Sequence, residues 1–147
     1  MKNISIIGGG PSGLMAADIL SANGYKVIIY DRKPTFGRKF LMAGRGGLNI
    51  SHSENLDNFI KKYGSQSKVF KKIINHFSPQ DLCDWCQELG EKTFVGSSGR
   101  VFPESFKASP LLRAWLARLK KQNVIFKTNH DCISWLNFVE KTAIICH

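Results

Sequence analysis

The sequence has no long apolar run, no secretory leader and no regular cysteine pattern. None of its apolar stretches approaches the length that a bilayer-spanning helix needs, so we expect a soluble protein. The N-terminus lacks the charged start, long apolar core and small-residue cleavage site of a signal peptide. The four cysteines are irregularly spaced, which argues against a disulfide framework. A reducing cytoplasm is therefore the expected compartment.

Acidic residues are also scarce, with 11 of them against 21 lysines and arginines, for a formal net charge of +10. Such an excess can attract nucleic acid, or it can serve a phosphate-bearing cofactor and a solvated surface. The sequence contains no arginine-rich run and no recognised nucleic-acid module, and its lysine pairs lie in stretches that resemble polar helix faces. These pairs are residues 61–62, 71–72 and 120–121. We therefore expect a solvated surface and no nucleic-acid partner.

The N-terminal segment ISIIGGGPSGLMAADILSANGYKVIIYD, residues 4–31, predicts a strand, a glycine turn, a helix and a second strand. Gly8, Gly10 and Gly13 fit G-x-G-x-x-G, in which the glycines permit a tight turn, close approach of a pyrophosphate and close packing of helix on strand. The predicted helix, residues 12–23, would direct its N-terminal amides at the phosphates. This order of elements favours a dinucleotide site over a chance glycine turn.

Asp31 closes the second predicted strand. A carboxylate at that place can accept hydrogen bonds from the ribose hydroxyls and would repel a 2′-phosphate, which disfavours NADP. The glycine turn itself does not distinguish FAD from NAD.

A basic loop follows, and no carboxylate occurs in residues 32–53. Such a loop can lay amides and cations along a phosphate chain or an electron-rich ring, although a basic surface loop fits its composition equally well. Its cations are Arg32, Lys33, Arg38, Lys39 and Arg45, and its glycines are Gly37, Gly44, Gly46 and Gly47.

Three motifs give the chain a resemblance to a known family. They are GRKFLMAGRGGLNISHSE (residues 37–54), FVGSSGRVFPESFKASPLLRAW (residues 94–115) and the initial GGGPSGLMAA. Together they resemble the BaiN/RdsA family of NAD(P)/FAD-dependent oxidoreductases. The resemblance implies a Rossmann-like α/β fold that binds FAD non-covalently, with electron or hydride transfer through the flavin and with NAD(P)H as a further partner of an intact form.

The resemblance also implies roles for particular residues. The glycine turn would hold the pyrophosphate and Asp31 the ribose. The basic loop would run past the ribityl chain toward the flavin, and the backbone near Asp131 and Cys132 would touch adenine. The implied cofactor-binding set is Gly8, Gly10, Pro11, Ser12, Gly13, Asp31, Arg32, Arg38, Lys39, Gly44, Gly46, Gly47, Asn49 and Cys132.

Beyond the loop the pattern predicts a nucleotide-binding core of residues 1–54 and 109–135, interrupted by a helical segment of residues 55–92. Apolar spacing predicts helices at 56–63, 68–77 and 78–89, and short strands at 93–95 and 100–102 around a Gly-Ser-Ser-Gly turn. Ser109 is expected to cap a further helix, with Pro110 at its first position and a core stripe of Leu111, Leu112, Trp115 and Leu119. Residues 124–126 are expected to form another strand, which the resemblance places beside the second one.

No catalytic acid or base follows from the sequence, and no metal site is expected. Cys83 and Cys86 form a single C-x-x-C without a second pair or a histidine pair, which favours ordinary core residues. His52 has a side chain suited to proton transfer, but a solvated loop histidine is the favoured interpretation. Arg100, Lys107 and Arg113 are flavin-side or substrate-side candidates by resemblance alone, against exposed charges as the equal alternative.

Members of the resembled family are considerably longer, and the likeness fades beyond Trp135. The sequence therefore predicts an incomplete, apparently truncated nucleotide-binding fold. The main hypothesis is the N-terminal FAD-binding part of an oxidoreductase. The alternative is a non-catalytic remnant or nucleotide-binding module that needs a separately encoded C-terminal half.

Overall fold

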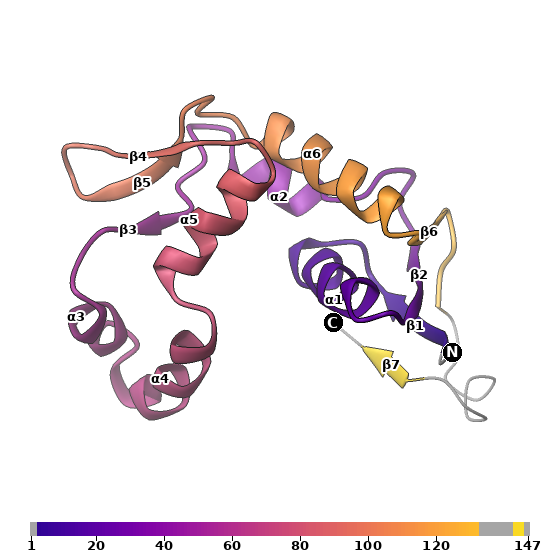
Figure 1. The fold of residues 1–147 in the computed structure, drawn as a ribbon, viewed down its shortest axis with the longest axis horizontal. Coiled ribbons are helices and arrows are strands. Elements are labelled where there is room, and N and C mark those ends of the chain that lie inside the picture. Colours follow the sequence, from indigo (N-terminus) through magenta and orange to yellow (C-terminus); the bar gives the residue numbers. More distant parts are fainter. Residues whose placement is uncertain (1–2, 133–142, 146–147) are drawn as a thin grey trace. The chain divides into compact units, whose positions relative to one another are not determined.

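The computed structural model describes residues 3–132 and 143–145, and the chain divides into two compact units (Figure 1). Unit 1 comprises Met1–Ala43 and Leu112–His147, and unit 2 comprises Gly44–Leu111. Residues 44–54, which the sequence placed with the nucleotide-binding core, lie in unit 2 by this division.

Unit 1 is built on a parallel sheet in the order β6-β2-β1-β7, whose strands are β1 (Asn3–Ile7), β2 (Lys26–Asp31), β6 (Ile125–Thr128) and β7 (Ala143–Ile145). The first two are the short, nearly continuous apolar runs that a buried parallel strand requires. The sheet confirms the predicted Rossmann-like α/β fold class, including the placement of residues 125–128 beside β2. The sequence also predicts strands in residues 133–147, and of these the structure describes residues 143–145, which form β7.

Two helices carry the apolar core of unit 1. On α1 (Pro11–Ala22) the side chains of Leu14 and Ala17 are fully buried. The helix α6 (Ala108–Lys121) begins in unit 2 and belongs to unit 1 from Leu112 on, and its expected stripe is confirmed, because Leu111, Leu112, Trp115 and Leu119 are all buried. The helix begins at Ala108, so the prediction that Ser109 caps it was wrong: Pro110 lies in the first turn, where its missing N–H costs no helical hydrogen bond.

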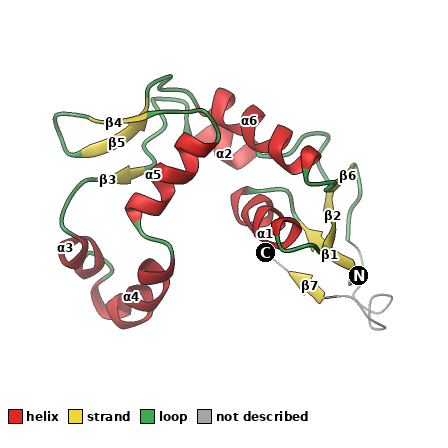
Figure 2. Ribbon diagram, viewed as in Figure 1, coloured by secondary structure: helices red, strands yellow, loops and turns green. Residues whose placement is uncertain are grey.

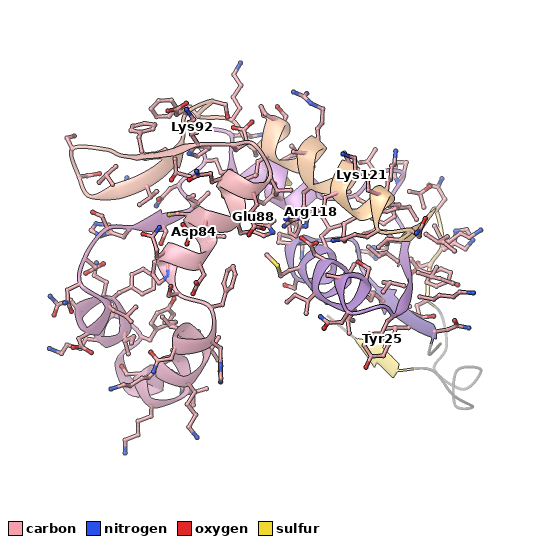
Figure 3. All side chains as sticks on the ribbon, viewed as in Figure 1. Tyr25, Asp84, Glu88, Lys92, Arg118 and Lys121 are labelled. Atoms are coloured by element: carbon pink, nitrogen blue, oxygen red, sulfur yellow. The ribbon has the colours of Figure 1, made fainter. Side chains whose placement is uncertain are left out.

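A buried carboxylate joins these two helices. Asp18, on α1, is only 6% exposed, and its Oδ2 accepts hydrogen bonds from Trp115 Nε1 at 3.0 Å and from Arg118 Nη2 at 2.9 Å. Figure 3 shows Arg118 extending from α6 toward α1. A buried charge is costly unless it is paired and hydrogen-bonded, and both conditions are met here. No local pattern predicts this contact, because its partners are separated by about a hundred positions.

Unit 2 combines short helices with a small antiparallel sheet (Figure 2). Its helices are α3 (Leu56–Lys61), a 3₁₀ turn η1 (Gly64–Gln66), α4 (Ser67–His76) and α5 (Pro79–Glu88). Its strands, in the order β3-β5-β4, are β3 (Ser51–His52), β4 (Thr93–Val95) and β5 (Arg100–Pro103). The three helices and the hairpin were predicted. Helix α2 (Arg38–Ala43) in unit 1 and strand β3 were missed, because both lie in the loop whose glycines and charges obscure periodicity.

The start of α5 follows the predicted cap. Ser78 Oγ accepts a hydrogen bond from the Asp81 amide at 3.2 Å, and the Asp81 carboxylate accepts one from the Ser78 amide at 2.7 Å. The Asp81 carboxylate also accepts a hydrogen bond from Ser78 Oγ at 2.7 Å, and the bonds from the Ser78 amide and hydroxyl lower the pKa of Asp81. The capping box therefore fixes the entry into α5 locally.

We predict that Asp18→Ala destabilises the protein by roughly 2–4 kcal/mol, because it leaves the Trp115 N–H and the Arg118 guanidinium without their shared acceptor in a buried place. Denaturant unfolding followed by tryptophan fluorescence measures the change. Arg113→Ala, which removes an exposed arginine from the same helix α6, is the matched control and should stay within about 0.5 kcal/mol of wild type. Equal stabilities of the two variants would contradict a structural role for Asp18.

Candidate dinucleotide site

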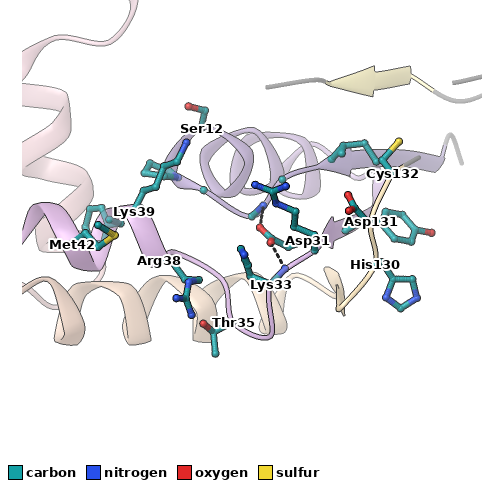
Figure 4. Close-up of a pocket in the computed structure, with 18 of the residues that line it drawn as sticks. Ser12, Asp31, Lys33, Thr35, Arg38, Lys39, Met42, His130, Asp131 and Cys132 are labelled. Atoms are coloured by element: carbon teal, nitrogen blue, oxygen red, sulfur yellow. Dashed lines mark hydrogen bonds between the residues drawn. The ribbon is translucent and has the colours of Figure 1, made fainter. Parts of the chain in front are cut away.

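A cavity of about 770 Å³ lies in unit 1 where β1 and β2 end (Figure 4). Ligands of open parallel sheets bind outside the carboxyl ends of the strands, so this is the expected place for a site. Four short segments line the cavity: residues 7–12 around the glycine turn, residues 30–33 with Thr35 at and after the end of β2, residues 38–40 with 42–43 from α2, and residues 130–132. In Figure 4 the side chains of His130, Asp131 and Cys132 lie on one side of Asp31, and those of Lys39 and Met42 lie on the other.

The glycine turn is held from both sides by backbone hydrogen bonds. The Gly8 amide donates to the Tyr30 carbonyl, and the Gly37 amide donates to the Gly9 carbonyl, each at 2.8 Å. Gly8 has φ +101°, in the region that favours glycine. A Cβ on Gly13 would lie 2.0 Å from the Gly8 carbonyl oxygen, so helix α1 can approach the turn this closely only with glycine at position 13.

The N-terminus of α1 opens into this cavity through Gly10, Pro11 and Ser12. Within the described residues no side chain caps this helix, and no acidic residue lies in its first turn. The first amides of a helix lack intrahelical acceptors, and they carry the positive end of the helix dipole. A 12-residue helix that presents them to a cavity can bind a phosphate there.

Asp31 ties the turn to the end of β2. Its Oδ2 accepts a hydrogen bond from the Gly9 amide at 2.7 Å, and its Oδ1 accepts one from the Lys33 amide at 2.8 Å (Figure 4). An ionised carboxylate has about four acceptor positions, so each oxygen keeps capacity for a further donor. Asp31 also lines the cavity, which leaves it able to accept a ligand hydroxyl while it holds the protein backbone.

The cavity lining is rich in positive charge. Four cations line it, and the carboxylates in the lining are Asp31 and Asp131. The cations are Arg32, Lys33, Arg38 and Lys39, and all four are exposed. Together with the α1 amides, these groups favour an anionic ligand.

On the far side of Asp31 the chain leaves β6 and passes along the cavity. The His130 amide donates to the Asp31 carbonyl at 3.0 Å, so this segment is fixed to the end of β2 by its backbone. The ring of His130 lies 5.9 Å from that of Tyr30, and its Nδ1 is 2.6 Å from the Thr128 carbonyl oxygen. Tyr30, His130 and Cys132 give this end of the cavity a partly apolar wall.

The structure brings many of the predicted cofactor residues together. The lining includes Gly8, Gly10, Pro11, Ser12, Asp31, Arg32, Arg38, Lys39 and Cys132. Gly13 lies behind the turn as a packing residue, and Gly44, Gly46, Gly47 and Asn49 belong to unit 2.

Several lining residues were not named as site residues from the sequence. They are Ile7, Gly9, Tyr30, Thr35, Phe40, Met42, Ala43 and His130. The sequence marks Gly9 only as the middle residue of the Gly-Gly-Gly run. A Cβ there would lie 1.9 Å from Phe36 Cδ1, so its role depends on a contact that the sequence does not display.

Two other candidates from the sequence, His52 and Cys86, make contacts that support the fold and lie outside the cavity lining. The Glu54 amide donates a hydrogen bond to Nδ1 of His52 at 3.2 Å. Because Nδ1 is the acceptor of this bond, the ring proton lies on Nε2, which is 3.1 Å from the Ser98 carbonyl oxygen. His52 is thus held between two backbone groups. Cys86 is fully buried, and burial, followed by the nearby Cys83 and Glu91, raises the pKa of its thiol to about 12, which makes it unreactive at neutral pH. Among the described residues no cluster of three or more His, Cys, Asp or Glu side chains is placed to hold a metal.

Comparison with known proteins agrees with this architecture. The ribosomal RNA dihydrouridine synthase of Escherichia coli (strain K12) is 27% identical over 130 residues, which are 88% of this chain and 32% of that protein. The crystal structure of Thermovibrio ammonificans THI4 matches with a TM-score of 0.52 and 20% identity, over 86% of this chain and 38% of that one. The crystal structure of the 3-ketosteroid-delta4-(5alpha)-dehydrogenase of Rhodococcus jostii RHA1 matches with a TM-score of 0.55 and 11% identity, over 87% of this chain and 38% of that one. The two structures establish the fold alone.

The chain thus spans about a third of the length of these relatives. Among the described residues, none of the helices has both the length and the apolar character that crossing a membrane requires. The model of the HI0933-like protein Rossmann domain matches residues 2–146, nearly the whole chain. The protein belongs to the HI0933-like Rossmann domain family.

Proposed function

We propose that this chain is the FAD-binding part of an oxidoreductase of the BaiN/RdsA type, in which electrons or a hydride pass through a non-covalently bound flavin. The observation that carries the proposal is the uncapped N-terminus of α1, which opens into a cationic cavity beside Asp31. A dinucleotide needs both an anion site and a ribose acceptor, and unit 1 offers the two side by side.

In this proposal the amides at the start of α1 bind the pyrophosphate, and Ser12 can add its hydroxyl. Arg38 and Lys39, at the start of α2, balance its charge. Asp31 accepts the ribose hydroxyls on the lone pairs that the Gly9 and Lys33 amides leave free. Adenine lies against the partly apolar wall that includes Tyr30, His130 and Cys132.

The flavin, once bound, supplies the redox chemistry. The residues of this chain fix the position of the dinucleotide and neutralise its phosphates. The alternative function, a nucleotide-binding module that needs a second chain for turnover, uses the same cavity. It differs in one observable: FAD would bind, but NAD(P)H would not be oxidised by the chain alone.

We predict that the purified protein, reconstituted with FAD, retains a yellow flavin chromophore through gel filtration. Absorbance of the protein peak at flavin wavelengths gives the FAD occupancy. Release of free flavin on denaturation shows that the flavin is bound non-covalently. A colourless protein that takes up no FAD would contradict the proposed function.

We predict that Asp31→Ala weakens FAD binding by about 10-fold to 100-fold, because hydrogen bonds to a charged group contribute roughly 1.5–3 kcal/mol each. The same change removes the repulsion of a 2′-phosphate, so the affinity for NADP should fall less than the affinity for FAD, or should rise. Fluorescence titration with each ligand measures both. Asp84→Ala, an exposed carboxylate on α5 in unit 2, is the matched control. Equal FAD affinities of the two variants would contradict a role for Asp31 in FAD binding.

A second candidate function is reduction of uridine in RNA. The observation that favours it is the likeness to a ribosomal RNA dihydrouridine synthase over 88% of this chain. We propose NAD(P)H as the donor for such a reaction: it would supply a hydride equivalent and solvent a proton, so that uracil would gain two hydrogens across its C5–C6 double bond and NAD(P)⁺ would be released.

The corresponding prediction is that RNA incubated with the FAD-loaded protein and NADPH yields dihydrouridine after digestion to nucleosides, as measured by mass spectrometry. A reaction without NADPH is the control. If FAD binds but no dihydrouridine forms, the second candidate function is excluded for this chain alone while the flavin site stands.

A further inference from the structure

The small sheet of unit 2 has one face that carries aromatic and cationic side chains. Phe94 and Phe102 are direct partners in the antiparallel β4–β5 pair, so their side chains lie on the same face. Arg100, two residues before Phe102, shares this face because side chains alternate along a strand. Along β5 the opposite residues, Val101 and Pro103, are buried, whereas Arg100 is exposed and Phe102 is partly exposed.

A third ring joins the pair from the segment after β5. The ring centroid of Phe106 lies 5.0 Å from that of Phe94 and 5.4 Å from that of Phe102, and the Phe94 and Phe102 centroids are 5.9 Å apart. Phe106 is still 49% exposed. Phe94, Phe102 and Phe106 therefore form an aromatic face, in which Phe106 is exposed and Phe94 and Phe102 are partly exposed.

Glycines surround these rings. A Cβ on Gly96 would lie 3.3 Å from Phe102 Cε2, and a Cβ on Gly47 would lie 3.7 Å from Phe106 Cδ1 and 3.9 Å from Phe102 Cε1. Gly46, the next residue toward the N-terminus, has open space around it. Side chains at these positions would cover the edges of the aromatic face, and their absence keeps it accessible.

Phe106 also has a backbone conformation that is uncommon for a bulky residue, with φ +56°. It is held there by two backbone hydrogen bonds, from the Phe106 amide to the Pro103 carbonyl and from the Leu48 amide to the Phe106 carbonyl, each at 2.9 Å. Glycine or asparagine would adopt this φ with less strain. Exposed aromatic side chains at strained positions are candidates for a functional contact.

The charges near the aromatic face are mainly positive. Arg100 lies on it, and Lys107 and Lys92 are the chain neighbours of Phe106 and of the start of β4; Lys92 is labelled beside the hairpin in Figure 3. Of the two nearby acids, Glu91 accepts a hydrogen bond from Ser105 Oγ at 3.0 Å. Glu104, two residues after Phe102, is exposed opposite Lys92, to whose carbonyl its amide donates at 2.8 Å. An aromatic surface with excess positive charge is complementary to planar bases on an anionic backbone.

We propose that the aromatic face of Phe94, Phe102 and Phe106 binds single-stranded RNA, with an unpaired base stacked on Phe106 and with Arg100 near a phosphate. An antiparallel sheet that presents aromatic rings on an open face is a known way to stack bases. The proposal deepens the second candidate function, because it names the surface that would hold the RNA, and it does not depend on flavin binding.

The test uses the full-length chain and a fluorescein-labelled ten-nucleotide oligouridylate, with binding measured by fluorescence anisotropy at low salt. Phe106→Gly removes the ring and relieves the backbone, and it should weaken binding by at least about fivefold, since stacking on one aromatic ring contributes roughly 1–3 kcal/mol. Phe106→Trp should retain the affinity. Arg100→Ala should weaken binding and lower the slope of log affinity against log salt by about 0.7.

Phe77→Ala is the matched control, because Phe77 is a comparably exposed phenylalanine of unit 2 outside the aromatic face. It should bind the oligonucleotide as wild type does, and a duplex of the same length should bind more weakly than the single strand. The proposal is overturned if Phe106→Gly and Phe77→Ala bind alike, or if duplex and single strand bind equally, since charge alone would then explain the binding. FAD occupancy, measured on the same samples, separates this outcome from a failure of the flavin site.

Discussion

The two amide hydrogen bonds of Asp31 are the constraint on which the candidate dinucleotide site depends. One oxygen holds the Gly9 amide and the other holds the Lys33 amide, so a single side chain sets both the glycine turn after β1 and the exit from β2. The glycine turn then positions α1, whose uncapped N-terminus faces the cavity. A ligand hydroxyl would use the same carboxylate, and because two backbone amides fix its position, little side-chain freedom would be lost on binding.

The core of unit 1 supports this arrangement from below. Leu14 and Ala17 of α1 and the buried stripe of α6 fix the helices, and the hydrogen bonds of Asp18 with Trp115 and Arg118 fix α1 against α6. Gly13 lets the start of α1 lie against the Gly8 carbonyl. The third glycine of the motif therefore contributes by packing, while the first two and Gly9 shape the cavity.

Much of the fold could be predicted from the sequence because it is encoded locally. The apolar runs of β1 and β2, the glycine motif and the Ser78 capping box are local signals, and each predicted its element. The contact of Asp18 with α6 joins residues that lie far apart in the sequence, and a buried aspartate has no periodic signature. The start of α6 was misplaced because Ser109 and Pro110 resemble a cap, although proline fits any place in a first turn.

The site residues Gly8, Gly10 and Asp31 were predictable because they belong to one continuous sequence motif. Gly9, Thr35 and His130 were missed because their roles arise from the packing of Phe36, from the unexpected helix α2 and from the path of the chain after β6. The aromatic face of unit 2 shows the same limit: Phe94 and Phe102 fell in predicted strands, but the approach of Phe106 depends on its unusual φ.

The measurement that tests the central claim most directly is calorimetric titration of the protein with FAD and, separately, with riboflavin. Riboflavin has the flavin ring but lacks the pyrophosphate, the adenine and its ribose, which are the groups that the cavity in unit 1 is proposed to bind. The account predicts that FAD binds at least about a hundredfold more tightly, because at least two charge-assisted contacts are missing for riboflavin. Equal affinities for the two ligands, or binding of neither, would contradict it.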